Sequence, residues 1–233
     1  MNRVVIISGA SSGIGAATAL ALAEHVRLVL VARRRERLDE LAARIRAAGG
    51  QALAIAIDLT AVNAPTEVVA QAVAHYGSLD AVVNNAGVFE TASIGSISPD
   101  HLERLWRLNV AAPMLLTQAA LVHLRGRNGG WIINISSTAA EAAYTGCGVY
   151  AGTKAALEVW SRTLREELRG TNVRVGVVAP GATDTEVWPA DSTFDRSRMC
   201  RAADVAAAVR FMLEAPASAS IDRVVVAPPG GPF

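Results

Sequence analysis

The sequence predicts one α/β domain with a parallel sheet of about seven strands, covered by helices on both faces. Length is the first observation, because 233 residues suit a single large domain with its own core. The second is a regular alternation of short β-branched runs with longer alanine-rich runs of helical periodicity. The third is that the runs at 4–7, 28–31 and 173–178 are apolar almost throughout, as strands buried on both faces are.

Strand and helix follow one another along the whole chain. Strands are expected at 3–7, 27–32, 51–57, 79–83, 131–136, 173–179 and 222–227. Helices are expected at 14–24, 35–48, 65–75, 100–125, 149–169 and 202–214. This order favours a single doubly wound, Rossmann-like domain over residues 1–233, in which residues at about 183–201 form a short lid over a substrate.

Composition and charge exclude several classes of protein. Hydrophobic residues make up 52% and charged residues 18% of the chain, which favours a folded core over disorder. The net charge of +1 gives no field that would attract nucleic acid or an anionic membrane. The apolar run at 16–32 carries Glu24, His25 and Arg27 at its centre, so we expect no membrane span. Partners of these two kinds are therefore not expected.

The cysteines and histidines point to neither disulfides nor metal. Cys147 and Cys200 lack the spacing of a disulfide framework or a zinc site, and the four histidines are scattered over predicted helices. A strand-like run begins almost at once, where a signal peptide would need a basic region and a cleavage site. We therefore expect no bound metal and a cytoplasmic location.

A glycine-rich loop lies between the first predicted strand and the first predicted helix. A dinucleotide binds at this place in such a sheet, because backbone N–H groups and the helix N-terminus meet its pyrophosphate there. The alternative interpretation is a capped helix start without a ligand. The cofactor-binding candidates in this loop are Gly9, Ser11, Ser12, Gly13, Ile14 and Gly15.

Two arginines follow the second predicted strand, where an NAD-binding protein of this topology carries an acid for the ribose hydroxyls. Arg33 and Arg34 would neutralise a 2′-phosphate that a carboxylate would repel, so the pair favours NADP(H) over NAD(H). The alternative is that residues 33–37 are a solvated helix start. Positive charge at a helix N-terminus opposes the helix dipole, and this mismatch favours a bound anion.

Tyr150 and Lys154 are the candidate catalytic pair. They are four positions apart on one predicted helix, and thus on one face. An ammonium group nearby would stabilise the phenolate and lower the pKa of the tyrosine toward neutral pH, where it could exchange protons. Lys154 is the single lysine among 22 basic residues, whereas Tyr144 has Gly148 one turn later and cannot play this part.

Ser137 follows the predicted strand at 131–136. A hydroxyl at the carboxyl end of a parallel strand faces the crevice where such sheets bind ligands, and it could hold a substrate carbonyl oxygen. The alternative is a Ser-Ser turn or a helix cap.

These features together resemble the short-chain dehydrogenase/reductase family, from Val4 to about Gly181 and more loosely beyond. The matching motifs, in order, are residues 8–15, Asp58-Leu59, Asn84-Asn85-Ala86-Gly87, Leu108-Asn109-Val110, Ser137, Tyr150-x-x-x-Lys154 and Pro180-Gly181-Ala182-Thr183. The resemblance implies that Tyr150 exchanges a proton with the substrate oxygen and that Ser137 orients it. It also implies that Lys154 lowers the tyrosine pKa and binds the nicotinamide ribose, while Asn109 supports a water-linked proton relay.

The resemblance also implies contacts to the cofactor and an oligomer. Asp58, with Leu59, would contact adenine, and the turn of Asn85, Ala86 and Gly87 would contact ribose. The segment after the sixth strand would reach the carboxamide and pyrophosphate through residues Pro180, Gly181, Thr183 and Thr185. The plain alternatives are that Asp58 caps a turn, that Asn84 and Asn85 satisfy loop backbone, and that Asn109 bonds the preceding helical turn. Family members form homodimers or homotetramers, and we expect the same here.

The sequence thus predicts an NADP(H)-dependent oxidoreductase that transfers hydride between nicotinamide and a carbonyl or secondary alcohol. A non-catalytic NADP(H)-binding sensor or scaffold on the same fold is the alternative. A sugar-nucleotide epimerase or dehydratase would need a larger substrate region than the roughly 50 residues after Pro180. The short lid predicts an open pocket, with Tyr144, Trp188, Phe194 and Met199 as candidate walls, and leaves the substrate itself undefined.

Overall fold

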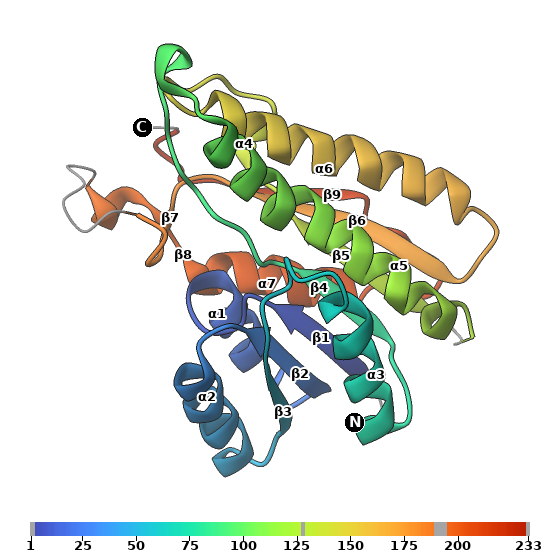
Figure 1. The fold of residues 1–233 in the computed structure, drawn as a ribbon. Helices are drawn as coiled ribbons and strands as arrows, with labels where there is room; N and C mark the ends of the chain where they lie inside the picture. Colours follow the sequence, from blue (N-terminus) through green and yellow to red (C-terminus); the bar gives the residue numbers. More distant parts are fainter. Residues whose placement is uncertain (1–2, 127–128, 189–194, 232–233) are drawn as a thin grey trace.

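Seven parallel strands form the centre of the protein in the computed structural model, which describes residues 3–126, 129–188 and 195–231 (Figure 1). The strand order is β3-β2-β1-β4-β5-β6-β9, and every neighbouring pair is parallel. The strands are β1 (Val4–Ser8), β2 (Arg27–Ala32), β3 (Gln51–Ala56), β4 (Ala81–Asn84), β5 (Gly130–Ile135), β6 (Val173–Pro180) and β9 (Arg223–Val226). The prediction of a doubly wound parallel sheet is confirmed.

Helices cover both faces of this sheet (Figure 1). One face carries α1 (Gly13–Leu22), α2 (Arg35–Ala47) and α7 (Ala202–Leu213), and the other carries α3 (Ala64–Tyr76), α5 (Ala112–Arg125) and α6 (Gly148–Glu167). A further helix, α4 (Pro99–Trp106), precedes α5, and β7 (Thr183–Asp184) pairs with β8 (Cys200–Arg201) outside the main sheet. Short 3₁₀ turns lie at Ile94–Ser96, Thr138–Ala140 and Arg196–Arg198.

Alternate residues of strands β1 to β6 enter two separate hydrophobic clusters. In β1, Val5 and Ile7 pack toward α1, α2 and α7, whereas Val4 and Ile6 pack toward α3, α5 and α6. The side chains of β1 alternate between the faces because a strand has a period of two residues. Both clusters are apolar, which explains why the strand sequences show no alternation of polar and apolar residues.

The helix expected at 100–125 contains an irregularity that periodicity did not predict. Between α4 and α5, residues Arg107–Ala111 form a turn of π-helix. Asn109 lies in this turn, where its side chain bonds the backbone of Val88 and the hydroxyl of Thr153. Such single π-turns inside helices are rare, and they occur frequently at functional sites.

The combined helix Pro99–Arg125 has the length and apolar character of a membrane span, with a mean hydropathy of 1.2 over its most apolar window. Its α5 part packs Leu116, Ala120 and Leu124 into the cluster on that face of the sheet. A buried helix of a globular core meets the same length and hydropathy criteria.

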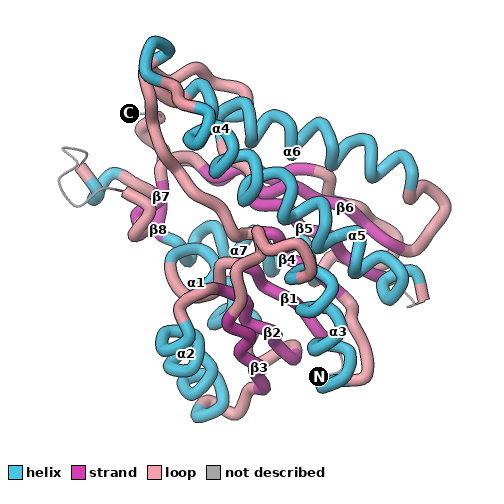
Figure 2. The backbone as a smooth tube through the Cα atoms, viewed as in Figure 1, coloured by secondary structure: helices cyan, strands magenta, loops and turns pink. Residues whose placement is uncertain are grey.

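The crevice for a ligand is set by the strand order. The direction in which successive strands are added to the sheet reverses between β1 and β4, because β1 pairs with β2 on one side and with β4 on the other. Connections leaving the carboxyl ends of such strands diverge, and ligands bind between them. Figure 2 shows the long loop that leaves β4 and runs to α4 along this edge of the sheet.

Two leucines of α1 test the packing of the first cluster. Leu22 is 1% exposed and Leu20 is 40% exposed. Leu22→Ala should lower the free energy of unfolding by about 2–5 kcal/mol, because it leaves a cavity in the core. Leu20→Ala should change it by less than about 1 kcal/mol. Urea unfolding of both variants measures the difference, and equal losses would contradict this packing.

Candidate active site

A cleft of about 1830 Å³ lies at the carboxyl ends of the strands. This volume exceeds the roughly 300–1,000 Å³ of common small-ligand pockets and leaves room for a dinucleotide with a substrate. The predicted site residues that line it are Gly9, Ser11, Ser12, Gly13, Ile14, Arg33, Arg34, Asp58, Leu59, Asn85, Ala86, Gly87, Ser137, Tyr150, Lys154, Pro180, Gly181, Thr183 and Thr185. Gly15 and Asn109 are the two predicted residues that lie behind its wall.

The glycines of the first loop are required by its geometry. Gly9 and Gly13 have φ angles of +68° and +53°, a region that favours glycine. A Cβ on Gly15 would lie 2.4 Å from the carbonyl oxygen of Gly9, so only glycine lets α1 pack this closely against the loop. The side chain of Ser12, at the N-cap of α1, caps no backbone N–H group of the helix.

The guanidinium of Arg34 is held beside this loop by Ser11, Ser12 and Glu186. Arg34 donates to Ser11 Oγ at 2.9 and 3.1 Å and to Ser12 Oγ at 2.6 Å. Its Nη1 lies 3.0 Å from a carboxylate oxygen of Glu186, an acid that the sequence analysis did not single out. Arg33 is exposed, and within the described parts of the chain no hydrogen bond or ion pair involves its guanidinium. Both predicted arginines line the cleft.

Asp58 and Asn85 line the cleft, and each also makes the local backbone contact that was the alternative to cofactor binding. Asp58 Oδ1 accepts hydrogen bonds from the backbone N–H and hydroxyl of Thr60, so it caps a turn. The bond from the Thr60 backbone, opposed by partial burial, lowers the pKa of Asp58. Asn85 donates to the carbonyl of Ser8 at 2.9 Å, which joins the loop after β4 to the end of β1.

Tyr150, Lys154 and Ser137 meet at the inner end of the cleft. Tyr150 and Ser137 line the same part of the cleft, where the Ser137 hydroxyl acts to lower the pKa of the tyrosine, and Ser137 Oγ accepts from the backbone N–H of Ala139 at 3.1 Å. Ser137 therefore caps the 3₁₀ turn, as the alternative had it, and contacts the tyrosine as well. Lys154 Nζ lies 5.8 Å from the ring centroid of Tyr150, and both side chains belong to the same face of α6.

The expected fall of the Tyr150 pKa toward neutral pH is wrong for this structure, because burial dominates. Burial raises the pKa of Tyr150 to about 12, and the hydrogen bond to Ser137 opposes that rise. Burial also lowers the pKa of Lys154 to about 8, while Glu158 opposes that shift. Lys154 Nζ donates to the carbonyl of Ile135 at 2.9 Å, so its charge is directed at the end of β5 as well as toward the phenol.

Asn109 is 1% exposed and lies beneath the cleft wall. Its amide donates to the carbonyl of Val88 at 2.9 Å, and its Oδ1 accepts from the Val88 backbone N–H at 2.8 Å. The alternative of a bond to the preceding helical turn is wrong, because the π-turn directs the side chain to the loop after β4. A Cβ on Gly87 would lie 3.1 Å from Asn109 Oδ1 and 3.6 Å from Lys154 Nζ, so both groups converge on this loop.

Sequence reasoning missed an aromatic residue beside the candidate tyrosine. Phe89 packs edge-on against Tyr150 with ring centroids 4.9 Å apart, and its centroid lies 5.1 Å from that of Trp188. Trp188 Nε1 donates to the carbonyl of Thr183 at 2.8 Å. Phe89 comes five residues after β4, which is a signal of position that could have indicated it.

Of the four residues predicted to line the substrate pocket, only some lie at the cleft. Tyr144 and Trp188 line the cleft, but Met199 does not. Phe194 and the middle of the predicted lid, residues 189–194, lie outside the described residues. Across residues 3–126, 129–188 and 195–231, no group of three or more His, Cys, Asp or Glu side chains could hold a metal ion.

Comparison with known proteins gives the family. The sequence model described as short chain dehydrogenase matches residues 3–195. The chain belongs to the short-chain dehydrogenase/reductase family. It is 41% identical over 187 residues to an uncharacterized oxidoreductase of Methylorubrum extorquens, covering 79% of this chain and 75% of the relative. The chain is therefore an oxidoreductase of this family.

Two solved structures of the family superpose over nearly the whole chain. A short chain dehydrogenase from Burkholderia cenocepacia in complex with NADP has a TM-score of 0.89 and 31% identity, covering 97% of this chain and 96% of that one. A 7α-hydroxysteroid dehydrogenase complexed with NADH and 7-oxo glycochenodeoxycholic acid has a TM-score of 0.91 and 27% identity, covering 99% and 94%. Structures this similar thus contain either nicotinamide cofactor.

The shifted pKa of Lys154 predicts how stability varies with pH. Its folded value of about 8 lies below the roughly 10.4 of an unfolded lysine, so the folded protein binds fewer protons between these values. The free energy of unfolding of the cofactor-free protein should therefore rise with pH in this window, by at most ~3 kcal/mol from this group. Above about pH 10 the raised pKa of Tyr150 reverses the trend, because the unfolded tyrosine ionises first.

Lys154→Met is the variant that isolates the lysine contribution. Urea unfolding at several pH values should show wild type gaining stability relative to this variant between about pH 8 and 10. A difference that stays constant with pH would mean that the folded lysine titrates normally.

Proposed function

We propose that the chain is an NADP(H)-dependent oxidoreductase that interconverts a carbonyl and a secondary alcohol, with Tyr150 as the general acid and base. The observation that supports this most is the meeting of Tyr150, Ser137 and Lys154 at the end of the cleft that also contains the glycine-rich loop. A proton-transfer group thus lies in one cavity with a dinucleotide cradle. The catalytic set is Tyr150, Ser137, Lys154 and, beneath the wall, Asn109.

The residues present fit a dinucleotide. At Gly13 a side chain would be strained by the φ of +53° and crowded by Thr185 Cγ2 at 3.1 Å from its Cβ. Without one, backbone N–H groups of the loop can approach a pyrophosphate. Ser11, Ser12, Arg33 and Arg34 supply hydroxyls and guanidinium groups for a 2′-phosphate, which supports NADP(H). When bound, the nicotinamide group supplies or accepts the hydride.

The residues of the chain then handle the substrate oxygen and its proton. Ser137 Oγ can donate to that oxygen and hold it next to the Tyr150 hydroxyl, which gives up a proton in reduction and takes one in oxidation. The raised pKa of Tyr150 keeps the phenol protonated, so reduction begins from the form present at neutral pH. Lys154 stabilises the phenolate that proton transfer leaves behind. Asn109 holds the loop at Val88 and so fixes the wall facing the lysine.

The outer cleft supports a small-molecule carbonyl or alcohol as substrate. Phe89, Tyr144 and Trp188 give it apolar and aromatic walls, and the segment at 183–201 would act as a short lid in a single catalytic domain.

We further propose a homodimer or homotetramer in the cytoplasm. Large apolar side chains are exposed along α4, α5 and α6 at Leu102, Trp106, Leu115, Val122 and Val159, and both cysteines are free.

Tyr150→Phe removes the proton-transfer group and keeps the ring. Reduction of ketones should fall by at least about 100-fold, since general acid catalysis contributes that much or more. The Kd for NADPH, measured by calorimetry, should stay within about threefold. Tyr144→Phe is the matched control, because Tyr144 lines the same cleft without a lysine one turn later. Turnover by Tyr150→Phe at the wild-type rate would instead favour a non-catalytic nucleotide-binding protein.

Arg33→Asp combined with Arg34→Ala tests the cofactor preference. Loss of two cations and gain of a carboxylate should lower the ratio of kcat/KM with NADPH to kcat/KM with NADH by about 10- to 100-fold. Steady-state kinetics with both cofactors measures the ratio. A wild-type enzyme that already prefers NADH would refute the argument from the 2′-phosphate.

A further inference from the structure

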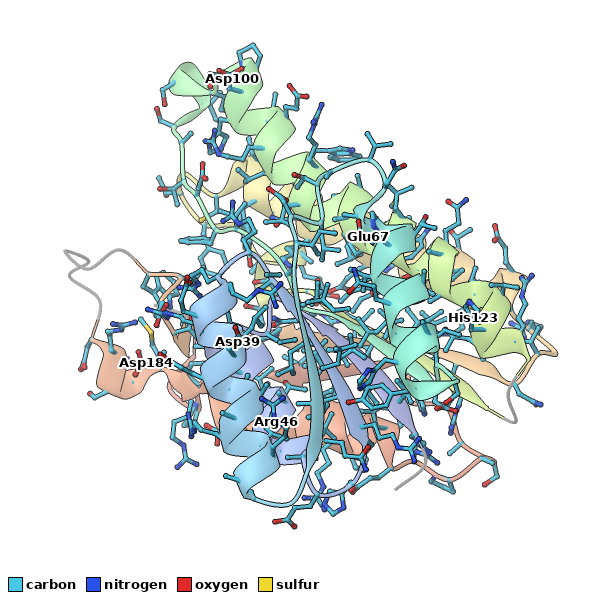
Figure 3. The ribbon with its side chains drawn as sticks, turned by 60° about the horizontal axis from the view of Figure 1, so that its bottom comes forward. Asp39, Arg46, Glu67, Asp100, His123 and Asp184 are labelled. Carbon is cyan, nitrogen blue, oxygen red and sulfur yellow. The ribbon has the colours of Figure 1, made fainter. Side chains whose placement is uncertain are left out.

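Glu186 lines the cleft near the glycine-rich loop and forms ion pairs with two arginines at the start of α2. Glu186 lies two residues after β7, and its carboxylate reaches Arg34 Nη1 at 3.0 Å and Arg37 Nη1 at 2.5 and 2.6 Å. The arginines belong to the N-terminal end of α2 on the other side of the cleft. Figure 3 labels Asp184 on the segment that carries Glu186 and Asp39 on α2, which shows where the two elements lie.

These ion pairs use Arg34, one of the two cations that we assign to a 2′-phosphate, together with Arg37 of the same helix end. Arg34 is held by Ser11 and Ser12 of the glycine-rich loop, so it lies between that loop and Glu186. The hydrogen bonds from Arg37 and Arg34 lower the pKa of Glu186, which is therefore ionised at neutral pH. Within the described chain, Glu186 is the carboxylate that pairs with either arginine.

The ion pairs of Glu186 with Arg34 and Arg37 are weak enough for another anion to replace the carboxylate. Side-chain exposure is 44% for Arg34, 45% for Arg37 and 55% for Glu186, so water screens all three groups. Exposed ion pairs of this kind are weak. A phosphate monoester carries more charge and one more acceptor oxygen than a carboxylate, and guanidinium groups bind it bidentately.

We propose that Glu186 is a specificity-determining residue, an internal anion that occupies Arg34 and Arg37 until the 2′-phosphate of the cofactor displaces it. The inference rests on the proposed preference for NADP(H) and adds the residue that opposes it. A ligand without the 2′-phosphate leaves the two ion pairs in place, whereas a ligand with it must break them. Glu186 thus reduces the gain in affinity that the 2′-phosphate gives.

The neighbouring segment supports an effect confined to this residue. Asp184, two positions earlier, pairs with Arg196 at 2.8 Å instead of with α2. Arg196 also donates to the carbonyl of Thr185, so the segment keeps its own attachment when Glu186 is released. Asp184→Asn therefore removes one carboxylate from the same segment without touching Arg34 or Arg37, and it is the matched control.

Calorimetric titration with adenosine 2′,5′-bisphosphate and with adenosine 5′-monophosphate tests the proposal on the intact protein. Glu186→Gln should tighten the bisphosphate Kd by about 3- to 10-fold, as expected for release of two exposed ion pairs, and should change the monophosphate Kd by less than about twofold. Asp184→Asn should change both by less than about twofold. Raising the salt concentration should reduce the gain.

The titration of the wild type and the titration of the Glu186→Gln variant test two different claims. Wild type alone reports the cofactor preference, because equal affinity for the two nucleotides would refute the NADP(H) assignment. The variant reports the role of Glu186 in either case. Bisphosphate binding by Glu186→Gln that equals or falls below the wild-type affinity would overturn the proposal, since Glu186 would then orient the arginines instead of competing for them. A gain of equal size for both nucleotides would also overturn it.

Discussion

A buried ammonium group is the constraint on which the rest of this site depends. Lys154 is 5% exposed, and its Nζ donates to the carbonyl oxygen of Ile135 at the carboxyl end of β5. Removing a charge from water is costly unless nearby dipoles and charges replace the solvent. The end of β5, the loop at Gly87 and the face of α6 must therefore keep a fixed geometry around it, and the same geometry places Tyr150 and Ser137 at the cleft.

Charge one turn further along α6 supports this arrangement. Glu158 is also 5% exposed and opposes the fall in the Lys154 pKa. Arg223, at the start of β9, donates to Glu158 at 3.1 Å and pairs with Glu141 at the same distance. The edge strand is thus tied by the Arg223–Glu158 pair to the helix that carries the tyrosine and the lysine, and Arg223 also reaches Glu141 before that helix.

The fold was predictable because its signals are local. Apolar strands, helical periodicity and a glycine-rich turn each depend on neighbours in sequence, and the seven strands were placed within two residues at every end. The π-turn was not predictable, because it depends on a bond between Asn109 and Val88, 21 positions apart. The pKa of Tyr150 was misjudged for the same reason, since burial comes from Phe89 and other tertiary neighbours. Glu186 carried no local signal, and only the folded chain brings it to Arg34.

The single lysine makes the surface chemistry of this protein unusual. Every cation in the ion pairs of the described residues belongs to arginine or histidine, and the one side-chain amine lies in the interior of the cleft. An amine-selective acylating reagent consequently has a single side-chain target, and a nucleotide lying in the cleft would shield it. Mass spectrometry of the peptide containing residue 154 would then report occupancy directly, with no dye, tag or coupled assay attached to the protein.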